Sequence, residues 1–358
     1  MFFFIINLIL YIINYKNIKL MQNNNHPFLK FKEISNKIKL GIDIGGTLTK
    51  VCVVFHKNEL EIKSIISSSK IFLYIIPTGE YYCCLTLFKS SAFETDILPI
   101  LKQLEIFSPI THIEATGGGA YKFSETMKKY FNIEFNKHDE LISLVKGYLF
   151  INFYNSFYKI DENDREIPVS KEDLIFPHIT VNIGSGTSIL KVSSLDDIQR
   201  ISGTILGGGT LIGLCKLIIN ENSYDKILHL CQQDDYNNVD LMFGNEIYND
   251  NLDGNEIMTM SLNKIEELKN SGKKVSNKDI AMCILIMICN NITQITNLLA
   301  EEHNVKQVYF LGNFSRRESP AIIMLNKCMK FWNKEINVRF NYYEGYLGAM
   351  GTLVEKKE

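Results

Sequence analysis

The sequence lacks the features that mark several classes of protein. Its 358 residues include eight cysteines, but none form a Cys-x-x-Cys pair, and the cysteines and seven histidines show no metal-site spacing. No long run of lysine or arginine occurs and the net charge is −2, so nucleic acid is not an expected partner. We expect reduced, mostly buried thiols, as in a cytoplasmic protein.

The N-terminus also falls short of a membrane anchor. Residues 2–13 are nearly all apolar, but a membrane-spanning helix needs about 20 residues. A secretory signal would need a positive start and a small-residue cleavage site, and both are missing. A membrane partner is therefore not expected. Three interpretations stay open for residues 1–35: a weak targeting segment, a packed or interfacial helix, or a gene-model artefact upstream of Met21.

Length and composition predict two domains. Hydrophobic residues make up 46% of the chain and charged residues 22%, which is enough for large cores. The polar stretch 155–177 favours an exposed loop. We therefore expect an N-terminal lobe over residues 36–155 and a C-terminal lobe over residues 156–358. Strands are expected near 38–44, 48–56 and 59–66, and a long helix near 278–302.

The most informative segment is residues 40–50, LGIDIGGTLTK. Apolar residues alternate up to Asp43, a glycine turn follows, and residues 51–55 form a second β-prone run. This pattern predicts a β-hairpin with a bare main chain at its tip.

The chemistry of this hairpin suits a nucleotide phosphate. Gly45 and Gly46 lack Cβ atoms, so the main chain can approach a bulky anion. Thr47 and Lys50 add a hydroxyl and a cation, and Asp43 can hold a hydrated Mg²⁺. The alternative is an ordinary glycine-rich hairpin turn.

The pattern recurs later in the chain. Residues 179–188, ITVNIGSGTS, again run from a strand into a glycine turn, and residues 114–119 resemble residues 308–313. The chain therefore reads as two related lobes that would enclose a nucleotide in a shared cleft. The glycines at 207–209 precede a predicted helix, and we expect them to present free N–H donors to an anion.

Together these motifs resemble the eukaryotic-type (type II) pantothenate kinases of the acetate-and-sugar-kinase/Hsp70/actin superfamily. The resemblance covers about residues 38–355. It implies an α/β protein with a two-lobed, ribonuclease-H-like actin/sugar-kinase fold, in which duplicated mixed sheets are flanked by helices. It rests on the ordered segments 40–50, 116–123, 138–141, 181–188, 200–210, 310–314 and 344–349.

The family pattern implies catalytic and substrate-binding roles. Glu140 matches the base that takes the proton from the primary hydroxyl of pantothenate. Ser185, Ser188 and Arg200 match residues that contact pantothenate or an acyl-CoA inhibitor, and Arg200 is also counted as catalytic, because its rigid fork suits a carboxylate or phosphate. Read without the family, Glu140 would be a helix-capping acid, Arg200 a surface arginine, and the serines turn-stabilising residues.

The pattern also implies an ATP site. Gly45, Gly46, Thr47 and Lys50 match the phosphate loop. The Mg²⁺ expected at Asp43 would be held through water. In the C-terminal lobe, Gly312 and Asn313 match the nucleotide-facing loop.

At two places the sequence departs from the family pattern, and these leave the shape of the pocket open. Asn249-Asp250 stands where relatives carry a Gly-Gly pair, and Cys328 replaces a smaller residue. Neither departure removes a catalytic group.

The resemblance implies a function and two rivals. The expected activity is ATP-dependent phosphorylation of pantothenate to 4′-phosphopantothenate, the first step of coenzyme A biosynthesis, with feedback inhibition by acetyl-CoA or another acyl-CoA. The rivals are a non-catalytic regulatory subunit of such a kinase and a sugar or N-acetylhexosamine kinase. A homodimer with dimerisation helices in the C-terminal lobe is expected, and a heterodimer with a paralogue stays open.

Overall fold

The structure, a computed structural model, divides the chain into two compact units. The first comprises residues 1–156 and 346–358, and the second comprises residues 157–345. The residues that the structure describes are 29–32, 37–68, 71–93, 95, 98–105, 109–170, 176–231, 241–243, 257–260, 264–272, 275–317 and 319–357.

The first unit is built on a six-stranded mixed sheet with the order β4-β5-β3-β2-β6-β7. Its first four strands in this order pair antiparallel, whereas β6 and β7 continue parallel to β2. The strands are β2 (Ile38–Ile44), β3 (Leu48–His56), β4 (Tyr74–Thr78), β5 (Tyr81–Lys89), β6 (His112–Thr116) and β7 (Glu134–Lys137).

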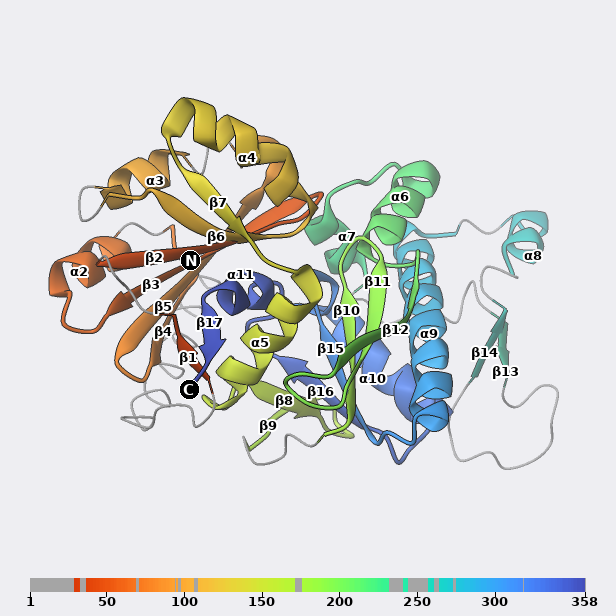
Figure 1. Cartoon of the computed structure of the whole chain (residues 1–358). Helices are drawn as coiled ribbons and strands as arrows, with labels where there is room; N and C mark the ends of the chain where they lie inside the picture. Colours follow the sequence, from red (N-terminus) through yellow and green to blue (C-terminus); the bar gives the residue numbers. More distant parts are fainter. Residues whose placement is uncertain are drawn as a thin grey trace. The chain divides into compact units, whose positions relative to one another are not determined.

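Helices cover both faces of this sheet (Figure 1). On one face, α2 (Leu60–Ser68), α3 (Leu98–Glu105) and α4 (Gly118–Phe131) share a hydrophobic core with the strands. On the other face lie α5 (Glu140–Asn152) and α11 (Leu347–Thr352). The expected strand at 59–66 is wrong, because Ile62 and Ile66 stand one helical turn apart and both point into the core.

The C-terminal segment belongs to the first unit, not to the second as expected. Gly41 of β2 explains the packing, since a Cβ there would overlap the Ala349 carbonyl oxygen of α11. The small residues of α11 thus bring its main chain against the bare main chain of β2.

Both ends of the described chain meet in this unit. β1 (Leu29–Phe31) pairs antiparallel with β17 (Val354–Lys356) (Figure 1). The Leu29 and Phe31 side chains are buried. Residues 29–31, which the sequence left in an uncertain extension, are therefore part of the fold, while residues 1–28 and 33–36 lie outside the described residues.

The second unit is built on a seven-stranded mixed sheet with the order β12-β11-β10-β15-β16-β8-β9. The hairpin β10–β11 lies beside the parallel strand β15, as β2–β3 lies beside β6 in the first unit. The strands are β8 (Phe157–Ile160), β9 (Glu166–Pro168), β10 (His178–Ile183), β11 (Thr187–Val192), β12 (Ile198–Thr204), β15 (Gln307–Leu311) and β16 (Asn337–Asn341).

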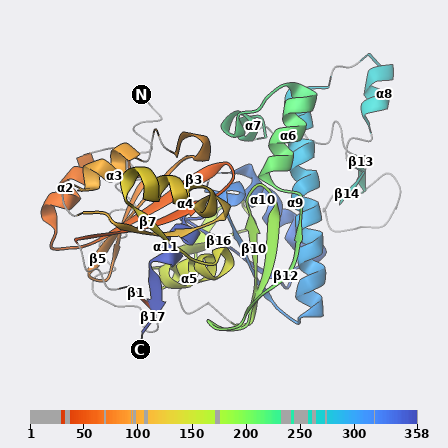
Figure 2. The same cartoon turned by 45° about the horizontal axis from the view of Figure 1, so that its top comes forward.

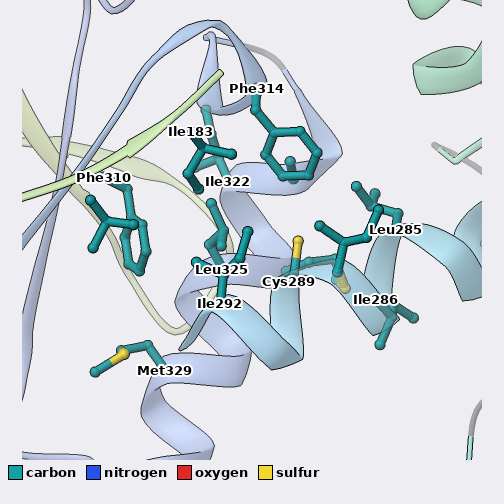
Figure 3. Packing of buried hydrophobic residues seen from close by; sticks show 14 of the residues in the cluster. Ile183, Leu285, Ile286, Cys289, Ile292, Phe310, Phe314, Ile322, Leu325 and Met329 are labelled. Atoms are coloured by element: carbon teal, nitrogen blue, oxygen red, sulfur yellow. The ribbon is translucent and has the colours of Figure 1, made fainter. Parts of the chain in front are cut away.

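The main helices of this unit are α6 (Gly208–Ile219), α7 (Tyr224–Leu230), α9 (Asn277–Glu302) and α10 (Pro320–Trp332). Figure 2 shows α6 beside α9. In Figure 3, side chains of α9 and α10 turn toward each other and toward Ile183 and Phe310 of the sheet. The shorter elements are η1 (Ser90–Ala92), α8 (Ile265–Asn270), β13 (Leu241–Phe243), β14 (Ile257–Met260) and η4 (Asn313–Ser315).

Helix α9 is long and apolar enough to cross a membrane by composition alone. However, 61% of its most apolar window is buried inside the protein. Its start agrees with the sequence, because the Ser276 side chain caps the helix by accepting a hydrogen bond from the Asp279 N–H. Burial accounts for the apolar composition of α9 without a membrane.

We predict that Gly147→Ala destabilises the first unit. A Cβ at Gly147 of α5 would overlap the Leu347 carbonyl oxygen of α11, so the two helices must separate, at a cost of about 1–3 kcal/mol. Gly213→Ala is the matched control: no atom lies within 4 Å of its added Cβ, and alanine is the better helix former. Thermal unfolding should show a lower melting temperature for the first variant only. Equal melting temperatures would contradict this packing.

Candidate active site

The glycine turn of the first unit is braced from one side. The Gly45 N–H donates to the Leu48 carbonyl at 3.0 Å, which closes the turn. Ser90 of η1 supports it further: its hydroxyl donates to the Gly45 carbonyl at 2.7 Å and its N–H to the Thr47 carbonyl at 2.9 Å. Gly46 and Thr47 are exposed at the tip. The tip is thus fixed in shape and open to a ligand, and no sequence motif pointed to Ser90.

Asp43 sits at the end of β2 in a close-fitting site. The antiparallel register sets it opposite Lys50, whose Nζ lies 3.1 Å from the Asp43 carboxylate. A Cβ added at Gly117 would lie 2.7 Å from Asp43 Oδ1, and one at Gly348 would lie 3.1 Å from Oδ2. Main chain therefore flanks the carboxylate on two sides and a cation on a third.

A single carboxylate in this position suits Mg²⁺. Among the described residues, no three or more His, Cys, Asp or Glu side chains gather as a metal site. Mg²⁺ keeps several waters and is commonly held by one or two carboxylates together with substrate phosphates. The donor chemistry at Asp43 fits such an ion, and does not fit a site made of protein ligands alone.

Glu140 is brought to the same edge of the first sheet. It is the first residue of α5, and Asp139 caps that helix by accepting a hydrogen bond from the Ile142 N–H at 2.9 Å. Asp43 pairs with Thr116 of β6, and the Thr116 hydroxyl donates to the His138 carbonyl at 2.9 Å. The chain reaches Glu140 two residues later. Glu140 is exposed, at a helix end that favours negative charge.

The turn of the second unit is supported differently. Ser185 is exposed between β10 and β11, where the Gly184 N–H donates to the Gly186 carbonyl at 2.9 Å. The first turn of α6 binds this turn directly: the Gly208 N–H donates to the Gly184 carbonyl at 2.8 Å and the Gly209 N–H to the Ser185 carbonyl at 3.0 Å. The expectation of free donors there is wrong for these two groups, because they hold the Ser185 turn in place.

Ser188 and Arg200 come together on neighbouring strands. Ser188 of β11 pairs with Gly203 of β12, and Arg200 also lies on β12. The Arg200 guanidinium lies over Gly203, with one nitrogen 3.0 Å from where a Cβ would stand. Arg200 is exposed and Ser188 half-buried. An exposed cation next to a hydroxyl can receive an anionic ligand.

Gly312 and Asn313 repeat the arrangement around Asp43. Gly312 follows β15 with a φ of +95°, and a Cβ there would lie 2.8 Å from Asn182 Oδ1. Asn313 begins η4 and lies against Gly345. Gly312 is thus the counterpart of Gly117, and Asn182 the counterpart of Asp43.

Glu344 is a buried acid that the sequence did not single out. Its Oε1 accepts a hydrogen bond from the Arg317 N–H at 2.7 Å, while Oε2 has no partner among the described residues. Burial raises the pKa of Glu344 to about 8, which outweighs the stabilising Arg317 N–H. The carboxyl therefore keeps its proton at neutral pH, beside the loop that carries Asn313.

The structure describes only one of the two positions at which the sequence departs from the family pattern. Asn249-Asp250 lies outside the described residues. Cys328 is half-buried on α10, and burial raises the pKa of its thiol to about 12. A thiol with such a pKa is protonated at neutral pH.

The chain matches one protein family over nearly its whole length. The family described as Fumble matches residues 39–355. A fission yeast (Schizosaccharomyces pombe) protein named pantothenate kinase is 32% identical over 345 residues, which cover 90% of this chain and 82% of that protein. The Arabidopsis thaliana protein named pantothenate kinase 1 is 34% identical over 256 residues, 67% of this chain and 64% of that protein, so the chain spans under two thirds of this second relative.

A solved structure supports the fold. Component A of the (R)-2-hydroxyglutaryl-CoA dehydratase of Acidaminococcus fermentans superposes with a TM-score of 0.51 at 13% identity, covering 88% of this chain and 96% of that one. At this identity the likeness shows the fold alone. Together with the two mixed sheets flanked by helices, it confirms the expected fold class.

We predict that Glu344→Gln changes the pH dependence of stability. The pKa of an ordinary glutamate is 4.5, whereas the pKa of folded Glu344 is about 8. Unfolding therefore releases a proton at pH values between these two. The free energy of unfolding therefore falls, by on the order of a few kcal/mol in total, as pH rises through this interval. Above the interval it levels off. Glutamine keeps the acceptor for Arg317 and has no proton to lose.

Urea unfolding at pH 5, 6.5 and 8 measures this effect. The stability of the Glu344→Gln variant relative to wild type should increase with pH. Glu162→Gln, on an exposed loop, is the control and should keep a constant difference from wild type. A constant difference for Glu344→Gln as well would contradict the buried, protonated carboxyl.

Proposed function

Because the chain belongs to the Fumble family, we propose that it is a pantothenate kinase, which transfers the terminal phosphoryl group of ATP to the primary hydroxyl of pantothenate. The product is 4′-phosphopantothenate, and the reaction begins coenzyme A biosynthesis. The observation that carries the proposal is the match over residues 39–355, together with pantothenate kinases at 32% and 34% identity.

The first unit supports this chemistry through Asp43, Lys50 and Glu140. Phosphoryl transfer depends mostly on positioning and on stabilising charge. The braced turn at Gly45–Thr47 and the Lys50 ammonium suit ATP phosphates. Mg²⁺ at Asp43, when bound, neutralises phosphate charge. Glu140 accepts the proton of the attacking hydroxyl, since an alcohol is a weak nucleophile until a base takes its proton.

The second unit supports recognition of the vitamin. Arg200 is an exposed cation beside Ser188, and Ser185 stands at the tip of the neighbouring turn. Pantothenate carries a carboxylate, which an arginine fork binds well. Gly312 and Asn313 face the nucleotide in this proposal, held by the strand ends on which they pack.

We predict that Glu140→Gln slows the reaction by about 100-fold or more, because a positioned general base contributes about 10²–10⁴-fold. The assay measures phosphorylation of labelled pantothenate with ATP, with and without Mg²⁺. Glu125→Gln, an exposed acid on α4, is the matched control and should keep the wild-type rate. A panel with sugars and N-acetylhexosamines tests the rival substrate class.

The outcomes separate the hypotheses. An inert wild type that still binds acyl-CoA would favour the regulatory-subunit alternative, and phosphorylation of a sugar in place of pantothenate would favour the sugar-kinase alternative. A wild-type rate in Glu140→Gln would remove Glu140 from the mechanism and leave the kinase assignment in place.

We predict that acetyl-CoA raises the melting temperature. A ligand that binds only the folded state adds about 2.7 kcal/mol at a hundred times its Kd. Arg200→Gln should abolish the shift, and Arg165→Gln, whose side chain is 71% exposed, should keep it. No shift for the wild type at saturating ligand would contradict an acyl-CoA site.

The same samples test the proposed homodimer. It is supported by apolar side chains left exposed at and near α6, where Ile205 is 88% and Leu217 81% exposed. Light scattering should give twice the mass of one chain, and the mass of one chain would contradict it.

A further inference from the structure

Three interacting side chains include His138, which lies two residues before Glu140, and the proposed function has not used them. Lys32 Nζ lies 2.6 Å from Glu114 Oε2 and 3.1 Å from His138 Nε2. His138 Nε2 also hydrogen-bonds to Glu114 Oε2. Asn136 Nδ2 donates to the other Glu114 oxygen at 3.2 Å. We call Lys32, Glu114 and His138 the anchor cluster.

The anchor cluster holds a fixed negative charge out of solvent. The Glu114 side chain is only 11% exposed, and Lys32 is 21% exposed. Burial alone would raise the pKa of Glu114, but the hydrogen bonds from His138 and Lys32 outweigh burial and lower it to about 2. Removing a partner from a buried charge leaves that charge uncompensated, so the three groups depend on one another.

His138 transmits this arrangement to the helix that carries Glu140. Its side chain binds Glu114, its N–H donates to the Ala115 carbonyl at 2.8 Å, and its carbonyl accepts from the Thr116 hydroxyl at 2.9 Å. Glu114, Ala115 and Thr116, which are successive residues of β6, therefore all hydrogen-bond to His138. Glu140 follows two positions later as the first residue of α5.

Lys32 reaches the cluster from the other end of the sequence. It follows β1, which pairs with β17, and its N–H donates to the Leu353 carbonyl at 2.8 Å. Its neighbour Lys30 has a different partner, Glu355, at 3.5 Å, and is about half exposed. The two lysines thus lie two residues apart and differ in their contacts.

We infer that Lys32 is a positioning residue of the kinase, which holds the start of α5 through Glu114 and His138 and so keeps Glu140 in its working orientation. The inference rests on the proposed role of Glu140 as the base. A small displacement of a catalytic group can cost about 100-fold in rate, so the contact matters without touching substrate.

The test compares kcat and KM for the full-length variants Lys32→Met, Lys32→Arg and Lys30→Met. Lys32→Met should lower kcat by about 10- to 100-fold and leave KM for ATP and for pantothenate within about 2-fold. Lys32→Arg keeps the cation and should recover most of the rate. Lys30→Met loses a lysine two residues away and should behave as wild type.

A double-mutant comparison distinguishes positioning from general loss of structure. If Lys32 acts through Glu140, Lys32→Met should have little further effect in a Glu140→Gln background. A merely structural role would lower the rate by the same factor in both backgrounds. Equal factors, a wild-type kcat in Lys32→Met, or no recovery in Lys32→Arg would each overturn the inference.

A second pair of variants covers the case in which Lys32→Met does not fold. His138→Leu removes the side-chain bond to Glu114, and His138→Gln keeps a donor at a similar reach. The inference requires a lower kcat in the first and recovery in the second, and equal rates would overturn it. An inert wild type would overturn the proposed function and this inference together, whereas an active wild type with unaffected variants would overturn the inference alone.

Discussion

A glycine pressed against the end of a neighbouring strand is the constraint on which both units depend. Gly117 follows β6 with a φ of +81°, and Gly312 follows β15 with a φ of +95°. In each case an added Cβ would come within 3 Å of a polar side chain one residue before the end of the adjacent parallel strand, Asp43 or Asn182. Only glycine combines this backbone conformation with this approach.

The two units use the same frame for different chemistry. In the first, the strand ends in the Asp43 carboxylate, which has Lys50 as its partner at 3.1 Å. In the second, the equivalent residue is Asn182, an amide that carries no charge. The equivalent position thus carries a charged carboxylate in the first unit and an uncharged amide in the second.

Local patterns predicted much of the fold and failed at identifiable places. The hairpin of β2 and β3 followed from alternation and the glycine turn, and α9 from its Ser276 cap. The segment 60–68 misled because its isoleucines have high β-propensity, although their spacing suits a helix. Candidate site residues could be named where a motif carried them, as at Asp43 and Arg200. Ser90 lies in none of the motifs, and Glu344 lies in segment 344–349 without a role assigned to it, because both roles arise from tertiary contacts and burial.

The contacts that no local pattern could predict are those that join the ends of the chain. Lys32 meets Glu114 across 82 positions of sequence, and Thr352 donates to the Glu114 carbonyl from 238 positions away. Gly348 comes from the same C-terminal helix and closes one side of the Asp43 site. Asp43 and Glu114 are therefore both in contact with residues of the C-terminal helix α11. Because β17 also pairs with β1, the C-terminal segment supports Lys32 as well as Asp43. It follows that the edge of the first unit that carries Asp43 is completed only by residues 346–357, although the six strands of its sheet lie within residues 38–137.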